Sequence, residues 1–207
     1  MAESTTLIRR AKHEDSDSIA KVHLSSFRGF FLTLLGRRFL QLLYSEILNE
    51  RGSVSLVAVS PDNEVVGFVV GVANQVGLYN RLAAKRWPAF ALAASGMALR
   101  HPSIIPRLWR AFKYPALAAQ ASCPALLMSL AVAPEVKGEG IGTSLIESFL
   151  NHMAQNGVDR VCLTTDRDHN ESTNRFYRKC GFSVARQFCT PEGRWMNEYV
   201  IQTKNDE

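Results

Sequence analysis

Cysteine is scarce in this sequence of 207 residues, and its four copies match no metal-binding pattern. Cys123, Cys162, Cys180 and Cys189 form no C-x-x-C pair and show no metal-ligand spacing. The N-terminal segment, residues 1–18, lacks the apolar core of a signal peptide. These absences predict a reduced, cytoplasmic protein without a bound metal.

Long hydrophobic runs, repeats and low-complexity tracts are also missing. The longest nearly apolar run, residues 87–99, is too short to cross a bilayer. With 46% hydrophobic and 21% charged residues, the composition is that of one globular domain over residues 1–207. The balance of 24 basic and 19 acidic residues gives +5, a mild excess that fits a phosphate-bearing ligand. No nucleic-acid motif is present, so nucleic acid is not an expected partner.

Acidic residues are absent from residues 65–134, which carry seven bases: Arg81, Lys85, Arg86, Arg100, Arg107, Arg110 and Lys113. Residues 76–120 are therefore interpreted as a helical insertion before the central strand. Residues 78–118 are expected to form two or three helical pieces, broken at Pro88, at Ser95-Gly96 and at later prolines. The insertion is either a lid that favours an anionic acceptor, a helix at a membrane surface, or a solvated basic face. A membrane partner is the disfavoured reading.

Hydrophobic periodicity predicts an α/β (α+β) fold with a mixed sheet. Strands are expected over residues 6–10, 53–60, 64–72, 124–132, 159–165, 182–188 and 194–203. Helices are expected from Asp15 or Ser16 to residue 27, and over residues 35–47, 141–153 and 170–180. The continuous apolar run of 124–132 is typical of a central strand buried on both faces. The strand–helix–strand–helix order of residues 124–180 implies one parallel pair of strands.

Three glycines, Gly138, Gly140 and Gly142, separate that central strand from the next helix. The first N–H groups of a helix have no intrahelical partner and carry the positive end of its dipole, so such a turn binds anions. It is not a P-loop, because Lys137 precedes the glycines, and not a dinucleotide fingerprint, because Thr143 replaces the last glycine. A tight turn with close helix–sheet packing is the alternative, and the glycines alone do not decide between the two.

Two segments together resemble the GNAT superfamily of acetyl-CoA-dependent acyltransferases. The first is Val132-Ala-Pro134 followed by residues 137–142, and the second runs from Asn170 through Phe176-Tyr177 to Gly181-Phe182. Lys137 stands where that family usually has Gln or Arg, and Thr173 replaces a small Ala. The resemblance is strong over residues 124–182, whereas the first 75 residues agree only in the order of elements. It implies a centrally splayed sheet of about seven strands, flanked by helices.

The resemblance also implies roles for individual residues. Acetyl-CoA would lie where the central strand and its parallel neighbour diverge, and Tyr177 would protonate the CoA thiolate as the catalytic residue. The backbone of Leu130, Ala131 and Val132 would pair with the pantetheine amides. The remaining implied cofactor contacts are Lys137, Gly138, Glu139, Gly140, Ile141, Gly142, Thr143, Asn170 and Phe176. By spacing alone, Asn170 is a helix cap and Tyr177 a core aromatic, and both readings are compatible with the implied roles.

The implied activity is acetyl transfer to an amine of a small acceptor by direct attack, without a metal. An anionic amine, such as an amino sugar nucleotide or an amino acid, is the candidate acceptor. An O-acyltransferase, a longer acyl donor and a non-catalytic acyl-CoA-binding module are the alternatives, and a homodimer is compatible with the sequence. The segments Arg28–Phe31 and Pro191–Arg194 are expected to border the acceptor.

The general base is the weakest point of the sequence prediction. Asp166, Asp168, His169 and Glu135 are weak candidates. An acceptor amine of low pKa, or a base acting through water, is therefore expected.

Overall fold

The computed structural model describes residues 6–100 and 122–203. Along the chain, the elements are β1 (Leu7–Arg10), η1 (His13–Asp15), α1 (Ser16–Ser26), α2 (Phe31–Leu34), α3 (Arg37–Leu48), β2 (Ser53–Val59), β3 (Val65–Val72), α4 (Leu78–Arg100), β4 (Ala125–Val132), η3 (Pro134–Val136), α7 (Ile141–Gln155), β5 (Arg160–Asp166), α8 (Glu171–Lys179), β6 (Ser183–Cys189) and β7 (Trp195–Gln202). All seven predicted strands are present. No helix within the described residues is both long and apolar enough to cross a membrane.

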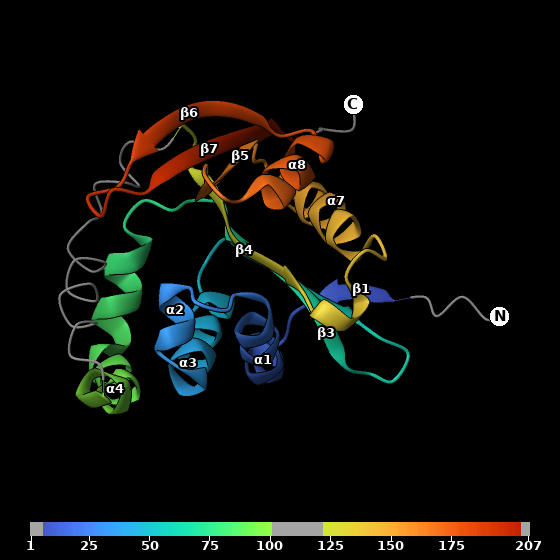
Figure 1. Cartoon of the computed structure of the whole chain (residues 1–207). Helices are drawn as coiled ribbons and strands as arrows, with labels where there is room; N and C mark the ends of the chain where they lie inside the picture. The colour runs from blue at the N-terminus through green and yellow to red at the C-terminus, as the bar shows by residue number, and fades with distance from the viewer. Residues whose placement is uncertain (1–5, 101–121, 204–207) are drawn as a thin grey trace.

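The seven strands form one mixed sheet in the order β1-β2-β3-β4-β5-β7-β6. Every neighbouring pair is antiparallel except β4 and β5, the predicted parallel pair. The crossover between these two strands is α7, which covers one face of the sheet, while α1 and α3 cover the other (Figure 1). The fold class expected from the sequence is therefore confirmed.

Each face of the sheet has its own hydrophobic core. On the α7 face, Ile141, Leu145, Phe149 and Met153 recur along one stripe of α7, and all four are buried. On the other face, α1 and α3 pack on β2 and β3 around Phe68 and neighbouring valines. A third, smaller cluster joins α3 to α4. The sheet thus lies between two helical layers, with α4 outside α3 (Figure 1).

The described part of the insertion, α4, consists of two helical segments joined at a kink. The kink lies next to Pro88 and agrees with the break expected there, whereas the helix continues through Ser95-Gly96, so the break expected at that point is wrong. Its one kink is at Arg86, with φ −141° and ψ 26°, two residues before Pro88. Proline clashes with the preceding turn and removes a helical hydrogen bond, which accounts for the kink. The predicted helical pieces of residues 101–118 lie outside the described residues.

Two helices begin without a side-chain cap, and one of them is α8, where Asn170 was expected to cap. Asp15 and Asn170 occupy the N-cap positions of α1 and α8, but neither side chain caps its helix. Asp15 instead accepts hydrogen bonds from Arg9 at 2.7 and 2.9 Å and from the Lys12 backbone at 2.7 Å. The hydrogen bonds from Arg9 lower the pKa of the Asp15 carboxyl below its usual value. Sequence spacing identified the helix starts but not these competing partners.

Candidate functional site

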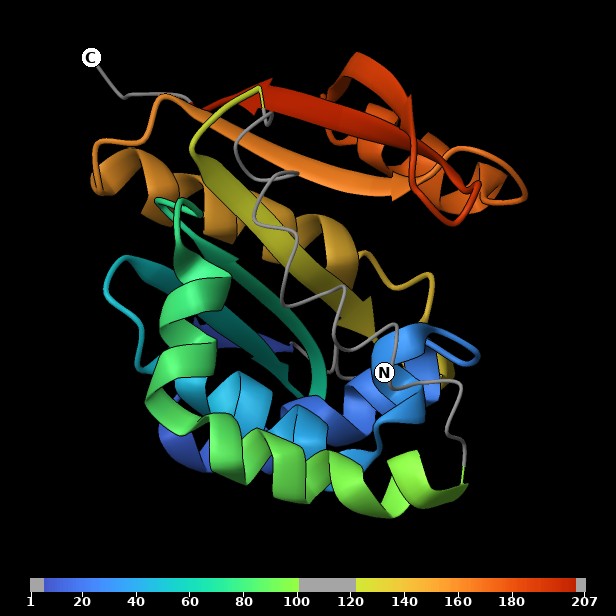
Figure 2. The same ribbon diagram turned by 90° about the vertical axis from the view of Figure 1, so that its left-hand side faces the viewer.

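β4 and β5 separate soon after they begin. They pair only at Ala125 with Val161 and at Leu126 with Cys162. Just beyond, the register between β3 and β4 shifts: Gly71 faces Leu127, but Val70 faces Ser129, so Met128 is an extra residue in β4. A β-bulge of this kind bends its strand. Figure 2 shows β4 and β5 starting side by side and then diverging.

The second half of β4 consequently lines the open space between the strands, which we call the splay. The prediction of full burial on both faces is wrong there: residues 128–130 and Val132 are half-buried, while Ala131 is buried. The Ala133 N–H donates to the Val66 carbonyl of β3 at 2.7 Å. Because backbone groups alternate along a strand, Ala131 also faces β3, and the N–H and C=O groups of Leu130 and Val132 face the splay. The Val132 carbonyl also accepts a hydrogen bond from the Ser26 hydroxyl at 3.1 Å.

The glycine turn presents a row of backbone donors at the start of α7. The Lys137 N–H donates to Pro134 at 3.4 Å and the Thr143 N–H to Gly140 at 2.9 Å. Between them, the N–H groups of residues 138–142 have no acceptor among the described residues. Unpaired donors at a helix N-terminus form a site for an anion. Backbone donors were expected over residues 137–143, and five of these seven residues, 138–142, have an unpaired N–H.

The three glycines serve two purposes. Gly138 and Gly140 have φ values of +103° and +81°, and a Cβ at either position would meet no atom within 4 Å. A Cβ on Gly142 would lie 3.3 Å from the Phe176 ring, so this glycine allows α8 to approach α7. Gly142 therefore permits close packing, as the alternative reading of the turn expects, and Gly138 and Gly140 leave open space above the donors.

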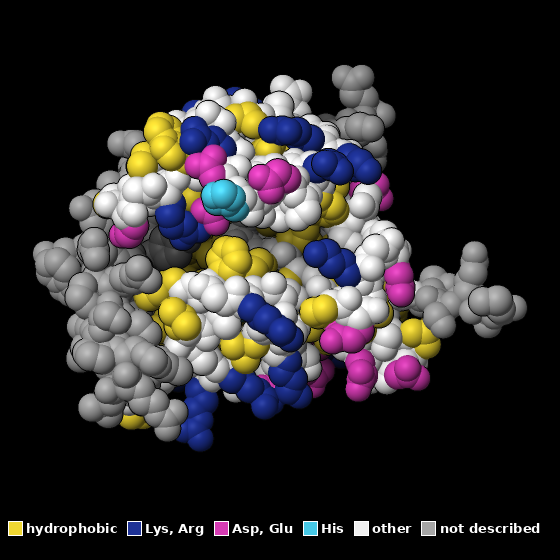
Figure 3. All heavy atoms as spheres, in the orientation of Figure 1, with side chains coloured by type: hydrophobic (Ala, Val, Ile, Leu, Met, Phe, Trp, Pro, Cys, Tyr) yellow, Lys and Arg dark blue, Asp and Glu magenta, His cyan; other side chains and the backbone are white. Residues whose placement is uncertain are grey.

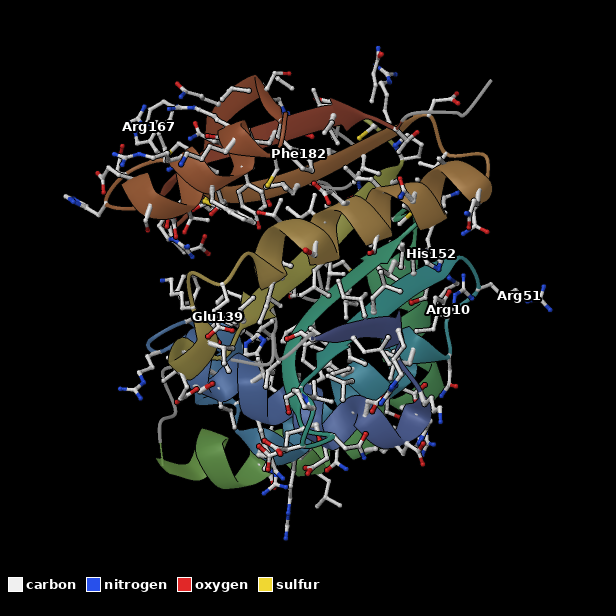
Figure 4. All side chains as sticks on the ribbon, turned by 90° about the vertical axis from the view of Figure 1, so that its right-hand side faces the viewer. Arg10, Arg51, Glu139, His152, Arg167 and Phe182 are labelled. Atoms are coloured by element: carbon white, nitrogen blue, oxygen red, sulfur yellow. The ribbon has the colours of Figure 1, made fainter. Side chains whose placement is uncertain are left out.

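Side chains around the turn differ in their surroundings. Lys137 and Glu139 are exposed, and Figure 4 places Glu139 at the N-terminal end of α7. Ile141 is buried in the core, so only its backbone faces the turn. Burial raises the pKa of the Cys180 thiol, and a hydrogen bond with Thr143 partly offsets this rise. Thr143 thus contacts Cys180, the residue that follows α8, and does not cap α7.

Asn170 and a second asparagine join α8 to the end of β5. The Asn170 amide donates to the Thr165 hydroxyl at 2.8 Å and to the Asp166 carbonyl at 3.2 Å. Asn174, which sequence reasoning did not single out, is 5% exposed and accepts hydrogen bonds from Asn197 at 2.9 Å and Tyr199 at 3.0 Å. These contacts fix α8 on the half of the sheet that contains β5 and β7.

Tyr177 lies in the core on the α7 side of the sheet. Its side chain is 8% exposed and packs against the rings of Phe176, Phe182 and Tyr199 at 5.3, 5.7 and 6.0 Å. Figure 4 shows Phe182 between α8 and α7. Burial raises the pKa of the Tyr177 hydroxyl above its usual value, so the group stays protonated at neutral pH. Within the described residues, that hydroxyl has no hydrogen-bond partner.

The four base candidates are not gathered at one place. Asp166 pairs with Arg194 at 2.6 Å, which ties the turn of residues 191–194 to the end of β5. Asp168 pairs with Arg167 at 2.7 Å, and this hydrogen bond lowers the pKa of its carboxyl. Glu135 and His169 are exposed. None of the four occupies β4, where the splay begins.

Part of the insertion's positive charge has internal partners. Arg81 pairs with Glu50 at 2.6 Å and Arg86 with Glu46 at 3.1 Å, which joins α4 to α3. The side chains of Lys85 and Arg100 are not described, and the other three bases of the insertion lie outside the described residues. For the two described arginines, the structure favours a role in packing.

Two polar pockets lie away from the splay. One of about 330 Å³ is lined by Arg167, Glu171, Asn174, Arg175, Arg178, Gln187 and Asn197, between α8 and the β6–β7 hairpin. The other, of about 450 Å³, is lined by Asp159, Arg160, Gln202 and Thr203. Figure 3 shows a separate hollow with hydrophobic side chains between the β6–β7–α8 half and the α1–α3 half. In the described parts of the chain, no group of three or more His, Cys, Asp or Glu residues is placed to hold a metal.

One polar group of side chains was missed altogether. His23 Nδ1 of α1 lies 2.7 Å from the Tyr44 hydroxyl of α3, and both side chains are buried. The two residues lie on different elements, so no sequence pattern connects them.

Comparison with known proteins agrees with this geometry. The family model described as Acetyltransferase (GNAT) family matches residues 106–182. The Arabidopsis thaliana protein named probable N-acetyltransferase HLS1-like is 33% identical over 67 residues, which are 32% of this chain and 16% of that protein. The chain therefore matches only a small part of this curated relative.

Solved structures extend the likeness to the whole fold. A GNAT-family protein from Desulfovibrio desulfuricans has a TM-score of 0.64 and 17% identity, covering 97% of this chain and 100% of that chain. The PaiA N-acetyltransferase of Thermoplasma acidophilum, solved in complex with coenzyme A, has a TM-score of 0.56 and 15% identity over 94% and 98% of the two chains. Residues 106–182 therefore match the GNAT acetyltransferase family, and the chain as a whole shares the fold of solved GNAT acetyltransferases.

Proposed function

We propose that this chain transfers an acetyl group from acetyl-CoA to an amine of a small acceptor by direct attack. The observation that carries the proposal is the row of five unpaired N–H groups at residues 138–142, next to the splay. A pyrophosphate over this row would receive hydrogen bonds and the positive end of the α7 dipole. The pantetheine arm would then extend along β4, where Leu130 and Val132 present backbone groups.

Tyr177 is the proposed proton donor to the departing thiolate. A buried phenol that stays protonated has a proton to give, and a thiolate of pKa about 8.5 accepts one. Because such a thiolate already leaves readily, we expect Tyr177→Phe to lower kcat by only about 10-fold, less than the roughly 10²–10⁴-fold that is typical of acid–base catalysis. Binding of acetyl-CoA should persist in this variant. An unchanged kcat would remove Tyr177 from the mechanism.

Glycine variants at the two ends of α7 test the pyrophosphate site. Gly140, before α7, and Gly157, after it, both have left-handed backbones, and a Cβ on either would meet nothing within 4 Å. Alanine at either position costs a similar strain of about 1 kcal/mol. Only Gly140→Ala would place a methyl group where the pyrophosphate is proposed, and we expect its Kd for acetyl-CoA to rise at least about 10-fold, a loss of about 1.4 kcal/mol.

The binding measurement is thermal stabilisation by acetyl-CoA and by CoA, followed by calorimetry. Gly157→Ala should bind acetyl-CoA with the same Kd as the wild-type protein. Equal weakening in both variants would mean that the turn does not hold the cofactor, and no stabilisation of the unchanged protein would end the proposal.

The acceptor class follows from an assay and not from the fold. A screen of small amines, amino acids and amino sugar nucleotides, reading free CoA released from acetyl-CoA, would identify it. Release with hydroxyl acceptors alone would favour an O-acyltransferase, and preference for longer acyl-CoA donors would change the donor. Binding of acetyl-CoA without release of CoA for any acceptor in the screen would favour the non-catalytic acyl-CoA-binding module.

A further inference from the structure

A side-chain hydrogen bond joins α1 to the strand that lines the splay. Ser26 is the last residue of α1, and its hydroxyl donates to the Val132 carbonyl of β4 at 3.1 Å, across 106 positions of the sequence. Its side chain is half-buried. Figure 2 shows the end of β4 beside α1, where this contact is made.

The Val132 carbonyl is one of the backbone groups that point into the splay. Val132 lies opposite Gly67 of β3, and the next N–H, that of Ala133, donates to the Val66 carbonyl at 2.7 Å. Because the backbone groups of successive residues point to opposite sides of a strand, the Val132 carbonyl points away from β3. A carbonyl oxygen has two lone pairs, so Ser26 takes one of them and a donor lying in the splay can take the other.

The segment that follows Ser26, residues 27–30, is closed on itself, and we call it the α1–α2 loop. The Thr33 hydroxyl of α2 donates to the Phe27 carbonyl at 2.6 Å, and the Phe30 N–H donates to the same carbonyl at 3.2 Å. The Phe27 and Phe30 rings pack edge to face, with 5.6 Å between their centroids. The loop and α2 are thus linked to each other, and Ser26 links them to β4.

The α1–α2 loop also has groups that are open to a ligand. Arg28 and Gly29 are exposed, and the Phe30 side chain is 46% exposed. The segment Arg28–Phe31 is the one that the sequence analysis expects to border the acceptor. The Ser26 hydrogen bond places the start of this segment two residues from a contact with the edge of the splay.

We propose that Ser26 is a positioning residue that couples the α1–α2 loop to acetyl-CoA bound along β4. This inference rests on the proposed function. A pantetheine N–H on the free lone pair of the Val132 carbonyl would fix the end of β4, and a fixed carbonyl holds the Ser26 hydroxyl more persistently. Local opening of the loop then becomes rarer when the cofactor is bound. The acceptor thus meets an ordered loop once the acetyl donor is in place.

Hydrogen exchange tests this coupling with acetyl-CoA alone, before any acceptor is known. The N–H groups of Phe30, Leu34 and Leu35 donate to carbonyls within the loop and α2, so their exchange reports its opening. We expect acetyl-CoA to slow their exchange by about 5-fold in the wild-type protein. In Ser26→Ala the slowing should disappear, while residues 138–142 remain protected by the cofactor. Ser26→Thr keeps a hydroxyl and should keep the slowing.

Ser25→Ala is the matched control. Ser25 precedes Ser26 on α1 and is also half-buried, but its hydroxyl donates within the helix, to the Val22 carbonyl at 3.0 Å. This variant should respond to acetyl-CoA as the wild-type protein does. Loss of the slowing in Ser25→Ala as well would mean that any change at the end of α1 loosens the loop, and it would overturn the specific role of Ser26.

The kinetic readout is the KM for the acceptor that the screen identifies. At saturating acetyl-CoA, Ser26→Ala should raise this KM by about 5-fold, the effect of losing one hydrogen bond, with kcat changed little. A lower kcat with an unchanged KM would place Ser26 in the chemical step and contradict the positioning role.

The exchange experiment separates the inference from the proposed function. Loop amides that slow equally in the wild-type protein and in Ser26→Ala, or that slow in neither, overturn the coupling through Ser26. If residues 138–142 are protected in the same samples, the proposed function stays intact. Failure of the wild-type protein to bind acetyl-CoA overturns both.

Discussion

At the scale of single residues, the burial of His23 has a consequence for stability. Its pKa is lowered to about 4, below the usual value of about 6.5 expected in the unfolded chain. The unfolded state therefore binds more protons between these values, and the stabilising contribution is complete above pH 6.5 and lost as pH falls toward 4. We expect the free energy of unfolding to drop by about 2 kcal/mol between pH 7 and pH 5 from this group alone.

The measurement is urea unfolding of the unchanged protein and of His23→Gln at both pH values. Subtracting the two profiles removes every other titrating group, and the difference is the histidine's own contribution. If His23→Gln loses as much stability on acidification as the unchanged protein, His23 is not neutral and buried in solution.

The glycine turn shows how far the sequence predicts a site at this scale. Glycine is visible in the sequence, so an anion site or a tight turn was expected at Gly138, Gly140 and Gly142. The reason for each glycine was not visible, because it depends on backbone φ and on neighbours such as Phe176 from another helix. The contact between His23 and Tyr44 was missed for the same reason: only the packing of α1 against α3 brings the two side chains together.

At the scale of elements, β4 shows what an apolar run does and does not determine. Its strand identity and central place were correctly predicted, since residues 125–132 are all apolar apart from Ser129. The bulge was not predicted, because it is a property of the pairing between β4 and β3 and not of β4 alone. The second half of the strand is therefore mostly half-buried, although the same composition would suit full burial.

Gly71 of β3 lies where the pairing of β3 with β4 leaves no room for a side chain. A Cβ there would lie 2.5 Å from both the Leu126 carbonyl oxygen and the Phe149 ring, beside the bulge. The carbonyl belongs to the backbone of β4 and cannot move without disturbing the strand, so we expect Gly71→Ala to lower the free energy of unfolding by about 3 kcal/mol. Acetyl-CoA should bind more weakly to this variant, because β4 also shapes the splay.

Gly67, on the same strand, provides the comparison. A Cβ there would come no closer than 3.2 Å, to the end of the Leu145 side chain. Gly67→Ala should therefore cost about 1 kcal/mol when both variants are unfolded in urea. Equal losses in the two variants would mean that β4 and Phe149 adjust freely around Gly71.

At the scale of the whole molecule, the similarity to solved structures reaches much further than the motifs. The motif segments cover residues 124–182, yet solved GNAT structures of 17% identity or less superpose over nearly the whole chain. The first 75 residues carry no family motif, but their alternating and helical hydrophobic patterns place β1–β3, α1 and α3 correctly. Hydrophobic patterns thus predicted these strands and helices, whereas the motifs are the basis of the proposed cofactor site.

The sheet consists of two halves that are joined by few backbone pairs. β1–β4 form one half and β5–β7 the other, and only two residue pairs connect them. A cofactor lying in the splay would contact the edges of both halves and the turn of residues 138–142. Binding should then suppress local opening at these edges, which hydrogen exchange detects.

We therefore expect acetyl-CoA to slow amide exchange at residues 138–142 and at Leu130 and Val132. The N–H groups of these residues lack acceptors in the turn or point into the splay. Strands β1 and β2, which are distant from the splay in the sheet order, should exchange at the same rate with and without the ligand, and they serve as the internal control. Protection concentrated instead at Arg175, Arg178 and Gln187 would place the ligand in the polar pocket between α8 and the β6–β7 hairpin, because that pocket is lined by these residues and lies outside the splay.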